Sequence, residues 1–255
     1  MLRLDKFLAD MGIGTRSEVK KYLKSNLVTI NGKIVKDSSV KVNPDSDQVM
    51  FDGKPVKYQE FFYYMLNKPA GCVSATRDGL SETVIEFLKD EPTRDLFPVG
   101  RLDKDTEGLL LITNDGMLAH NLLSPKKHVD KTYFAFVDKT LSQEEETEFS
   151  KGLDIGDDTP TLPAEIKLID LEKAEQYLRA NQSEATANLA YDAAYSVVLK
   201  EGRYHQVKRM FEHFGSTVNY LKRISMGNLK LDKELSPGQY RALTEEEITS
   251  LKSNE

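Results

Sequence analysis

The chain has 255 residues, of which 39% are hydrophobic and 30% charged, and its net charge is −6. This composition is typical of a globular protein and excludes a disordered, fibrous or membrane-embedded chain. The longest apolar stretch is far shorter than the roughly 18–20 residues of a membrane span, and no export signal is visible. We therefore expect a soluble, cytoplasmic protein. The single cysteine, Cys72, excludes an internal disulfide framework and a cysteine-based zinc site.

The charges are distributed unevenly along the chain. Residues 1–58 hold 11 basic and 7 acidic side chains, whereas residues 59–255 hold 24 basic and 34 acidic ones. The sequence therefore predicts a small basic domain over 1–58 and a larger acidic domain over 59–255. Because a phosphate backbone needs only a local positive patch, the acidic total does not exclude RNA or DNA as a partner.

The first domain is predicted to open with two helices. Apolar residues at helical spacing predict a helix over 4–11. Thr15 and Glu18 form a capping-box pattern at the start of the second helix. Three cations lie four residues apart on one face of that helix and form a basic stripe: Arg16, Lys20 and Lys24. Taken alone, a charged face of this kind is more often solvated than bound to a ligand.

Turn signals follow the two helices. Asn31-Gly32 between β-branched residues is the strongest short-range signal for a tight hairpin, and Asp52-Gly53 marks a second turn. The order of helix, capped basic helix and hairpin over residues 3–35 resembles the S4 RNA-binding domain. The resemblance implies that the second helix, with its basic stripe, lies against structured RNA.

A linker over 55–62 is predicted to lead into the second domain, in which strands and helices are separated. Strands are expected over 61–69, 109–113, 129–137, 164–169, 195–199 and 217–221. Helices are expected over 81–90, 116–123 and 205–214, and the polar segment 171–194 favours helix. This mixture favours an α+β domain with a mainly antiparallel sheet over a repeating parallel βαβ array.

Charged residues are densest just before and after the strand predicted over 109–113. Asp103 stands two residues after Arg101, a cation that can hold its carboxylate ionised. An ionised aspartate can act as a nucleophile or a base, although Asp103 and Asp105 can also be simple turn residues. Asp115, in an Asn-Asp-Gly sequence before a predicted helix, is typical of a turn or a helix cap.

Two later segments carry further candidates. Lys131 and Tyr133 point to the same side of one predicted strand, and Tyr133 can equally be a core aromatic. Lys208 and Arg209 lie off the apolar face of the helix predicted over 205–214. Considered alone, they are ordinary solvated cations of a helix.

Together these segments resemble the pseudouridine synthases of the RsuA/RluB type along nearly the whole chain. The resemblance is carried by NKPAGCVSA, GRLDKDTEGLLLITNDG, KTYFAFV, GRYHQVKRMF and LKRISMGNLKL. The GRYHQVKRMF motif is most similar to the RsuA branch, which acts on the 16S rRNA of the small subunit. The resemblance implies an enzyme that isomerises uridine to pseudouridine in ribosomal RNA without a cofactor or a metal. We also expect a monomer with no membrane partner.

The same resemblance implies roles for individual residues. Asp103 matches the catalytic aspartate, and Tyr133 matches the tyrosine that stacks on the target uracil. Lys208 matches the basic residue, arginine in many relatives, that pairs with the aspartate; lysine keeps the charge but lacks the bidentate fork. A late motif near the active cleft is matched by Leu221, Arg223 and Gly227. Candidate RNA contacts besides the basic stripe are Arg101, Arg203 and Arg223.

Other functions remain open on the sequence alone. The enzyme could act on 23S rRNA, or the chain could be a non-catalytic S4-type RNA-binding or ribosome-assembly factor. The joint presence of Asp103, Tyr133 and Lys208 argues against a non-catalytic factor. A third reading is a metal-dependent hydrolase that uses Asp103, Asp105 and Glu107. The sequence also leaves open whether the substrate is free rRNA or a precursor particle, and whether Asp103 attacks C1′ or takes the 2′ proton.

Overall fold

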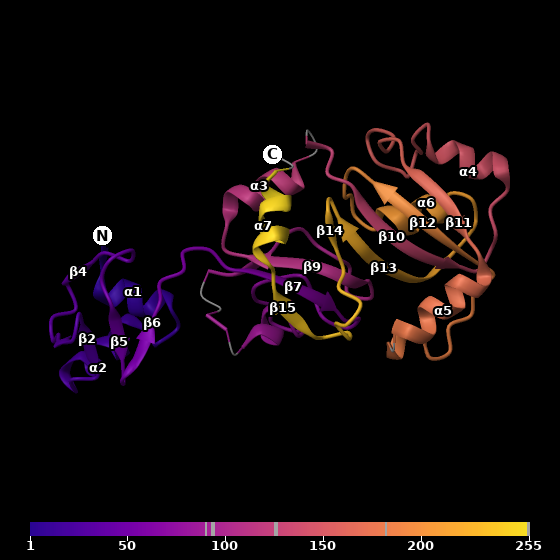
Figure 1. Cartoon of the computed structure of the whole chain (residues 1–255). Coiled ribbons are helices and arrows are strands. Elements are labelled where there is room, and N and C mark those ends of the chain that lie inside the picture. The colour runs from indigo at the N-terminus through magenta and orange to yellow at the C-terminus, as the bar shows by residue number, and fades with distance from the viewer. Residues whose placement is uncertain (90, 93–94, 125–126, 182, 254–255) are drawn as a thin grey trace. The chain divides into compact units, whose positions relative to one another are not determined.

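The computed structural model of the chain describes residues 1–89, 91–92, 95–124, 127–181 and 183–253. The chain divides into two units, whose elements are labelled in Figure 1. The first unit contains Met1–Phe62 and Leu88–Leu96, and the second contains Tyr63–Phe87 and Phe97–Glu255. The division thus falls four residues after the boundary predicted at 58/59, and a second, later segment joins the first unit.

Two helices and short strands build the first unit. The helices are α1 (Leu4–Asp10) and α2 (Arg16–Lys24). One small sheet pairs β1 (Leu2–Arg3) with β4 (Lys41–Val42). The other has the order β3 (Lys33–Ile34), β2 (Val28–Ile30), β5 (Val49–Phe51) and β6 (Lys54–Val56). Because β6 pairs with β5 as far as Val56, the linker predicted over 55–62 starts later than expected.

Local sequence signals set the turns of this unit. The Thr15 hydroxyl accepts a hydrogen bond from the Glu18 amide, and the Glu18 carboxylate accepts one from the Thr15 amide, so the predicted capping box is formed. Asn31 and Gly32 have φ values of 51° and 79° and join β2 to β3 as the predicted tight turn. These short-range features are confirmed.

The core of the first unit fixes which face of α2 is free. Its buried side chains come from both helices and three strands: Leu4, Phe7, Leu8, Val19, Leu23, Val28, Val42 and Val49. Val19 and Leu23 bury one face of α2, and the three cations of the basic stripe lie outside that face and are exposed. The stripe is therefore available to a ligand.

The second unit is built on a large sheet whose order is β11-β12-β10-β13-β9-β7-β15 in the described residues, with β14 beside β13 and β8 beside β9. The strands are β7 (Tyr63–Lys68), β8 (Phe97–Pro98), β9 (Glu107–Thr113), β10 (Lys131–Val137), β11 (Glu165–Ile169), β12 (Ala193–Leu199), β13 (Val218–Met226), β14 (Leu229–Lys230) and β15 (Tyr240–Ala242). The helices are α3 (Gly116–Leu123), α4 (Gln143–Phe149), α5 (Leu171–Asn181), α6 (Gln206–Glu212) and α7 (Glu245–Lys252), with 3₁₀ turns η1 (Val84–Leu88) and η3 (Glu184–Thr186). The predicted α+β class with a mainly antiparallel sheet is confirmed.

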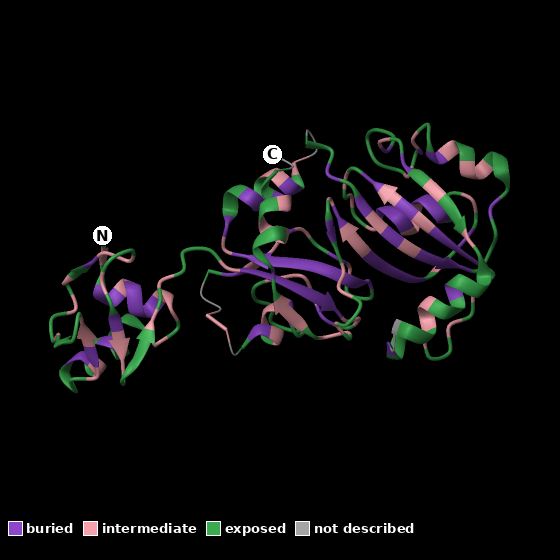
Figure 2. Ribbon diagram, in the orientation of Figure 1, coloured by how far each residue is buried: buried purple, intermediate pink, exposed green. Residues whose placement is uncertain are grey.

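Helices cover different parts of this sheet (Figure 1). Leu118 of α3 and Leu251 of α7 pack on side chains of β7 and β9, whereas Ala174 of α5 packs on Phe136 of β10 and Tyr220 of β13. Strands β7 and β9 are buried along their whole length (Figure 2). In the described residues, no helix is both long enough and apolar enough to span a membrane.

The helix predicted over 81–90 is wrong in type. The structure has the 3₁₀ turn η1 there, and residue 90 lies outside the described residues. Thr83 forms a parallel bridge with Val73, and its amide and hydroxyl both donate to the Glu86 carboxylate. Thr83 is thus part of a β-bridge, and the helical turn begins only after it, at Val84.

Gly108 allows β9 and β13 to pair in parallel. It lies opposite Arg223 in this ladder and has a φ of 105°. A Cβ atom at Gly108 would lie 2.2 Å from the Arg223 carbonyl oxygen, a distance that no side chain tolerates. Only glycine therefore permits this approach, directly after the loop that carries Asp103.

Candidate active site

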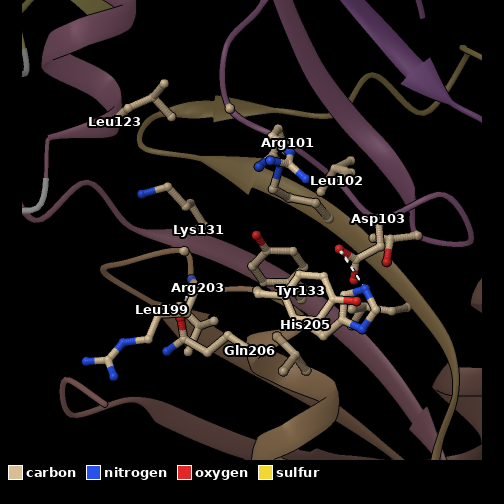
Figure 3. A pocket seen from close by; sticks show the side chains of 17 residues that line it. Arg101, Leu102, Asp103, Leu123, Lys131, Tyr133, Leu199, Arg203, His205 and Gln206 are labelled. Atoms are coloured by element: carbon tan, nitrogen blue, oxygen red, sulfur yellow. Dashed lines mark hydrogen bonds and ion pairs between the residues drawn. The ribbon is translucent and has the colours of Figure 1, made fainter. Parts of the chain in front are cut away.

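A cavity of about 400 Å³ lies in the second unit, and Figure 3 shows the side chains that line it. Its walls come from the loop before β9, from β10 and β13, and from the segment that leads into α6. The lining includes Gly100, Arg101, Asp103, Lys131, Tyr133, Arg203, Tyr204, His205, Leu221 and Arg223. The fold thus gathers at one cavity the segments of Asp103, Tyr133 and the late motif, which are far apart in sequence.

The loop that carries Asp103 is held by a buried lysine. Lys68, at the end of β7, is fully buried, and its Nζ donates to the carbonyl oxygens of Asp103 at 3.0 Å, Lys104 at 3.3 Å and Thr106 at 2.9 Å. Burial lowers the pKa of Lys68, while nearby acidic groups oppose that shift. Because one ammonium group ties several carbonyls of the same loop, Lys68 fixes the backbone from which the Asp103 side chain projects.

Ser74 adds a second attachment for this loop. Its hydroxyl donates to the Leu102 carbonyl at 2.9 Å and accepts from the Leu102 amide at 3.0 Å. The residue directly before Asp103 is therefore bound on both sides of its backbone. Neither Lys68 nor Ser74 was singled out from the sequence, because their role depends on carbonyl groups about 30 residues later in the chain.

Two basic side chains face the Asp103 carboxylate. The Nε2 atom of His205 lies 3.7 Å from Oδ1, as the dashed line in Figure 3 shows, and the Nζ atom of Lys208 lies 3.7 Å from Oδ2. The Asp103 side chain is 27% exposed, so its carboxylate remains open to a substrate. The pairing predicted for Lys208 and Asp103 is thus present at ion-pair distance.

The shorter contacts of Lys208 go to Asp105. Its Nζ donates to the two carboxylate oxygens of Asp105 at 2.6 and 2.7 Å. Neighbouring groups partly desolvate the Asp105 carboxylate, but the hydrogen bonds and the charge of Lys208 outweigh this effect and lower the pKa of the Asp105 carboxyl. Lys208 therefore lies between two carboxylates, and Asp105 has a part in the site beyond that of a turn residue.

The floor of the cavity is aromatic and positively charged. Tyr133 is 8% exposed, and Lys131 and Arg223 are also buried. Burial, and next the charge of Arg223, lowers the pKa of Lys131 to about 8. Arg223 donates through Nε to the Leu109 carbonyl at 2.8 Å, and its buried Nη2 has no hydrogen-bond partner in the described part of the chain. Arg223 can therefore meet RNA only from inside the cavity.

Arg203, for which an RNA contact is predicted, is held by several groups within the chain. Its guanidinium donates to the Glu201 carboxylate at 3.0 Å, to the carbonyls of Thr159 at 2.6 Å and Pro160 at 2.8 Å, and to Asp157 at 3.4 Å. These contacts bind the loop before α6 to the segment before β11. By contrast, Arg101 is exposed at the cavity, where an RNA contact is geometrically open to it.

Glu107 does not join Asp103 and Asp105 in a common carboxylate cluster. It is buried, and its two oxygens accept from the Ser183 hydroxyl at 2.5 Å and the Tyr220 hydroxyl at 2.7 Å. In the described residues, no three His, Cys, Asp or Glu side chains are arranged to hold a metal ion. This geometry does not fit the donor set that the hydrolase reading requires.

Asp115 caps a helix, as predicted. Its carboxylate accepts from the Leu118 amide at 3.0 Å and from the Tyr63 hydroxyl at 2.7 Å, at the start of α3. This structural role accounts for its burial and separates it from the cavity chemistry.

Comparisons with known proteins agree with this architecture. Residues 62–213 match the family model for RNA pseudouridylate synthase, and residues 2–49 match that for the S4 domain. The chain is 47% identical to an uncharacterised RNA pseudouridine synthase of Bacillus subtilis, with 97% of each chain covered. It is 37% identical to ribosomal small subunit pseudouridine synthase A of Yersinia pestis, with 98% of each chain covered. A crystal structure of a pseudouridylate synthase is 36% identical, with a TM-score of 0.64 and coverage of 98% of this chain and 100% of the other.

The fold and the cavity therefore define a pseudouridine synthase. The chain belongs to the RNA pseudouridylate synthase family, with an S4 domain ahead of its catalytic unit. Its full-length relatives include the ribosomal small subunit pseudouridine synthase A of Escherichia coli, at 36% identity over 98% of this chain and 100% of the relative.

Proposed function

We propose that this enzyme converts one specific uridine of 16S rRNA to pseudouridine in the cytoplasm. The observation that carries the proposal is the convergence of Asp103, Tyr133 and Lys208, from three separate segments, at and beside one cavity. The similarity to small subunit pseudouridine synthases A over the full chain supports the choice of 16S rRNA. The three residues carry the roles that the family resemblance implies.

The chemistry matches what these side chains can do. Pseudouridylation breaks the N1–C1′ bond of uridine, turns the base and rejoins it through C5, without gain or loss of atoms. Detaching the uracil builds positive character at C1′ and negative charge on the base. The carboxylate of Asp103 compensates the positive character at C1′, either by attack at C1′ or by taking the 2′ proton. The face of Tyr133 holds the base while it turns.

Cations around the cavity act on the charges of the reacting groups. Lys208 places a positive charge 3.7 Å from the Asp103 carboxylate and orients it until it reacts. Lys131 and Arg223, buried at the cavity floor, place positive charge where a detached, negatively charged uracil would lie. Because they are fixed in place before the reaction, they stabilise that charge without reorganisation.

Binding of the RNA is assigned to the S4 domain. The target uridine must leave its stack to enter the cavity, which costs a few kcal/mol that phosphate contacts elsewhere must offset. The exposed basic stripe of Arg16, Lys20 and Lys24 supplies such contacts.

Mapping pseudouridines in rRNA tests this function. rRNA from cells with and without the gene is compared at every uridine, and the deleted strain is complemented with wild type or with Asp103→Asn. We expect one 16S position to lose its pseudouridine on deletion, and only wild type to restore it. Loss of a 23S position instead would overturn the choice of substrate, and restoration by Asp103→Asn would overturn the role of Asp103.

A further inference from the structure

Two stacked rings stand at the cavity beside Asp103. The rings of Tyr204 and His205 have centroids 3.8 Å apart and planes inclined by 15°. Tyr204 is 70% exposed, although most of the large aromatic side chains of this chain are buried or half-buried. Both residues line the cavity. A tyrosine this exposed adds little to the core, so its ring is available to a ligand.

The backbone of His205, the second residue of this stack, has a left-handed conformation. Its φ of 48° and ψ of 35° lie in the left-handed region, which residues other than glycine rarely occupy. In this conformation the imidazole lies 3.7 Å from the Asp103 carboxylate (Figure 3). Strain of this kind persists where surrounding contacts impose it, and it gathers at functional sites.

Two arginines hold the segment that carries the ring pair. Arg203, directly before the ring pair, is bound to Thr159, Pro160 and Asp157. Arg209, one turn into α6, donates to the Tyr204 carbonyl at 3.1 Å and to Asp157 at 2.6 Å. The segment that carries the two rings is therefore held by hydrogen bonds on both sides. The rings are already fixed in place before RNA binds, so little conformational entropy is lost on stacking.

We propose that the open face of Tyr204 stacks against the nucleobase next to the target uridine. This inference rests on the proposed function, because it assumes that the uridine enters the cavity. A uridine turned out of its strand leaves its neighbour without a stacking partner at the cavity entrance. An aromatic ring replaces that partner for any of the four bases, since every base has a π face. Tyr204, backed by His205, is thus a positioning residue for the RNA strand.

Kinetics on a short RNA that spans the mapped uridine test this platform. Tyr204→Ala removes the ring, Tyr204→Phe keeps it, and Met117→Ala is the control, since Met117 is also 70% exposed but does not line the cavity. We expect Tyr204→Ala to raise KM about tenfold, within the range for loss of one base–aromatic stack, with kcat nearly unchanged. Tyr204→Phe and Met117→Ala should match wild type, and all variants should melt at the wild-type temperature.

An abasic substitution beside the uridine identifies the ring's partner. With wild-type enzyme, an abasic site at the stacked neighbour should raise KM by the same factor as Tyr204→Ala does on intact RNA. The Tyr204→Ala enzyme on the abasic RNA should show no further rise in KM. An unchanged KM for Tyr204→Ala would overturn the proposal. So would KM increases from Tyr204→Ala and from the abasic site that multiply, whichever neighbour of the uridine is made abasic. Wild-type turnover of the intact RNA reports the proposed function separately, so the failure of either proposal is recognisable.

Discussion

Lys208 donates a hydrogen bond to each carboxylate oxygen of Asp105, at 2.6 and 2.7 Å. The same ammonium lies 3.7 Å from the carboxylate of Asp103. The Asp105 side chain is 72% exposed, whereas that of Lys208 is 16% exposed. The two short hydrogen bonds of Lys208 thus go to the exposed carboxylate, and its longer contact goes to the carboxylate that lines the cavity. One ammonium group therefore contacts both carboxylates of the loop before β9.

Replacing Lys208 should therefore affect turnover more than binding. We expect Lys208→Ala to lower kcat by about 10- to 100-fold, because the partly buried Asp103 carboxylate loses a positive charge 3.7 Å away, with KM nearly unchanged. Lys208→Arg should recover part of the activity because it keeps the charge. Asp105→Asn, the control, leaves the pairing with Asp103 intact and should cost much less. Single-turnover kinetics at saturating protein measure these rates; a defect confined to RNA binding would make Lys208 a phosphate contact.

Asp103→Asn should abolish pseudouridine formation while folding and RNA affinity stay near wild type. The amide keeps the shape of the side chain, and Lys68 still binds the backbone carbonyl at this position, but the ionised oxygen is lost. Product is counted in purified rRNA, with melting temperature and RNA binding measured in parallel. Turnover within tenfold of wild type would contradict the catalytic assignment.

The basic stripe on α2 should govern the salt dependence of binding. Replacing Arg16, Lys20 and Lys24 with Ala should weaken rRNA binding and flatten the slope of log affinity against log salt by up to about 2–3 units, if each cation neutralises one phosphate. The chemical step at saturating RNA should remain near normal. A triple variant at the exposed Lys33, Lys36 and Lys54 removes the same charge elsewhere in the unit and is the matched control. Equal slopes for wild type and the stripe variant would make the stripe a solvated face.

Two buried lysines should make stability rise with pH. Burial lowers the pKa of Lys131 and of Lys222 to about 8, from 10.5 for an exposed lysine. Between these two values the unfolded chain binds more protons than the folded one, so raising the pH favours folding, by at most about 1.4 kcal/mol per pH unit for each lysine.

Urea unfolding between pH 7.5 and 9.5 measures this effect. We expect the free energy of unfolding of Lys131→Met to rise less steeply with pH than that of wild type, whereas Lys33→Met, at an exposed position, should keep the wild-type slope. The range stops at pH 9.5 because tyrosines begin to ionise above it. Burial raises the pKa of Tyr58, for example, to about 12, so at higher pH this residue makes the free energy of unfolding fall as the pH rises. Parallel curves for wild type and Lys131→Met would contradict the low pKa.

Features set by neighbouring residues were predictable from the sequence. The Thr15–Glu18 capping box, the Asn31-Gly32 hairpin turn and the Asp115 cap each depend on a few adjacent residues, and all three are confirmed. The separated strands and helices predicted the α+β class of the second unit, and the family motifs pointed to Asp103, Tyr133 and Lys208 as site residues.

Features set by distant contacts were not predictable. The role of Lys68 depends on carbonyls of a loop 35 or more residues later, and the contacts of Arg203 depend on carbonyls of the separate segment before β11. Helices α4 and α7 were missed because each buries a single side chain in the structure, which leaves almost no apolar periodicity to detect. The polar faces of both helices resemble loops in sequence, although both begin with a capping box.

The parallel pairing of β9 with β13 has a consequence for the protein's own synthesis. Arg223 reaches back to the Leu109 carbonyl across 114 residues of sequence, through the contact that Gly108 permits. Domains form as units, the N-terminal ones first, while a chain is being made. A nascent chain that has emerged only as far as α5 already has its basic stripe, but it lacks the strand of Arg223 and the helix of Lys208. Under the proposed function, the residues assigned to RNA binding are therefore complete before those assigned to catalysis.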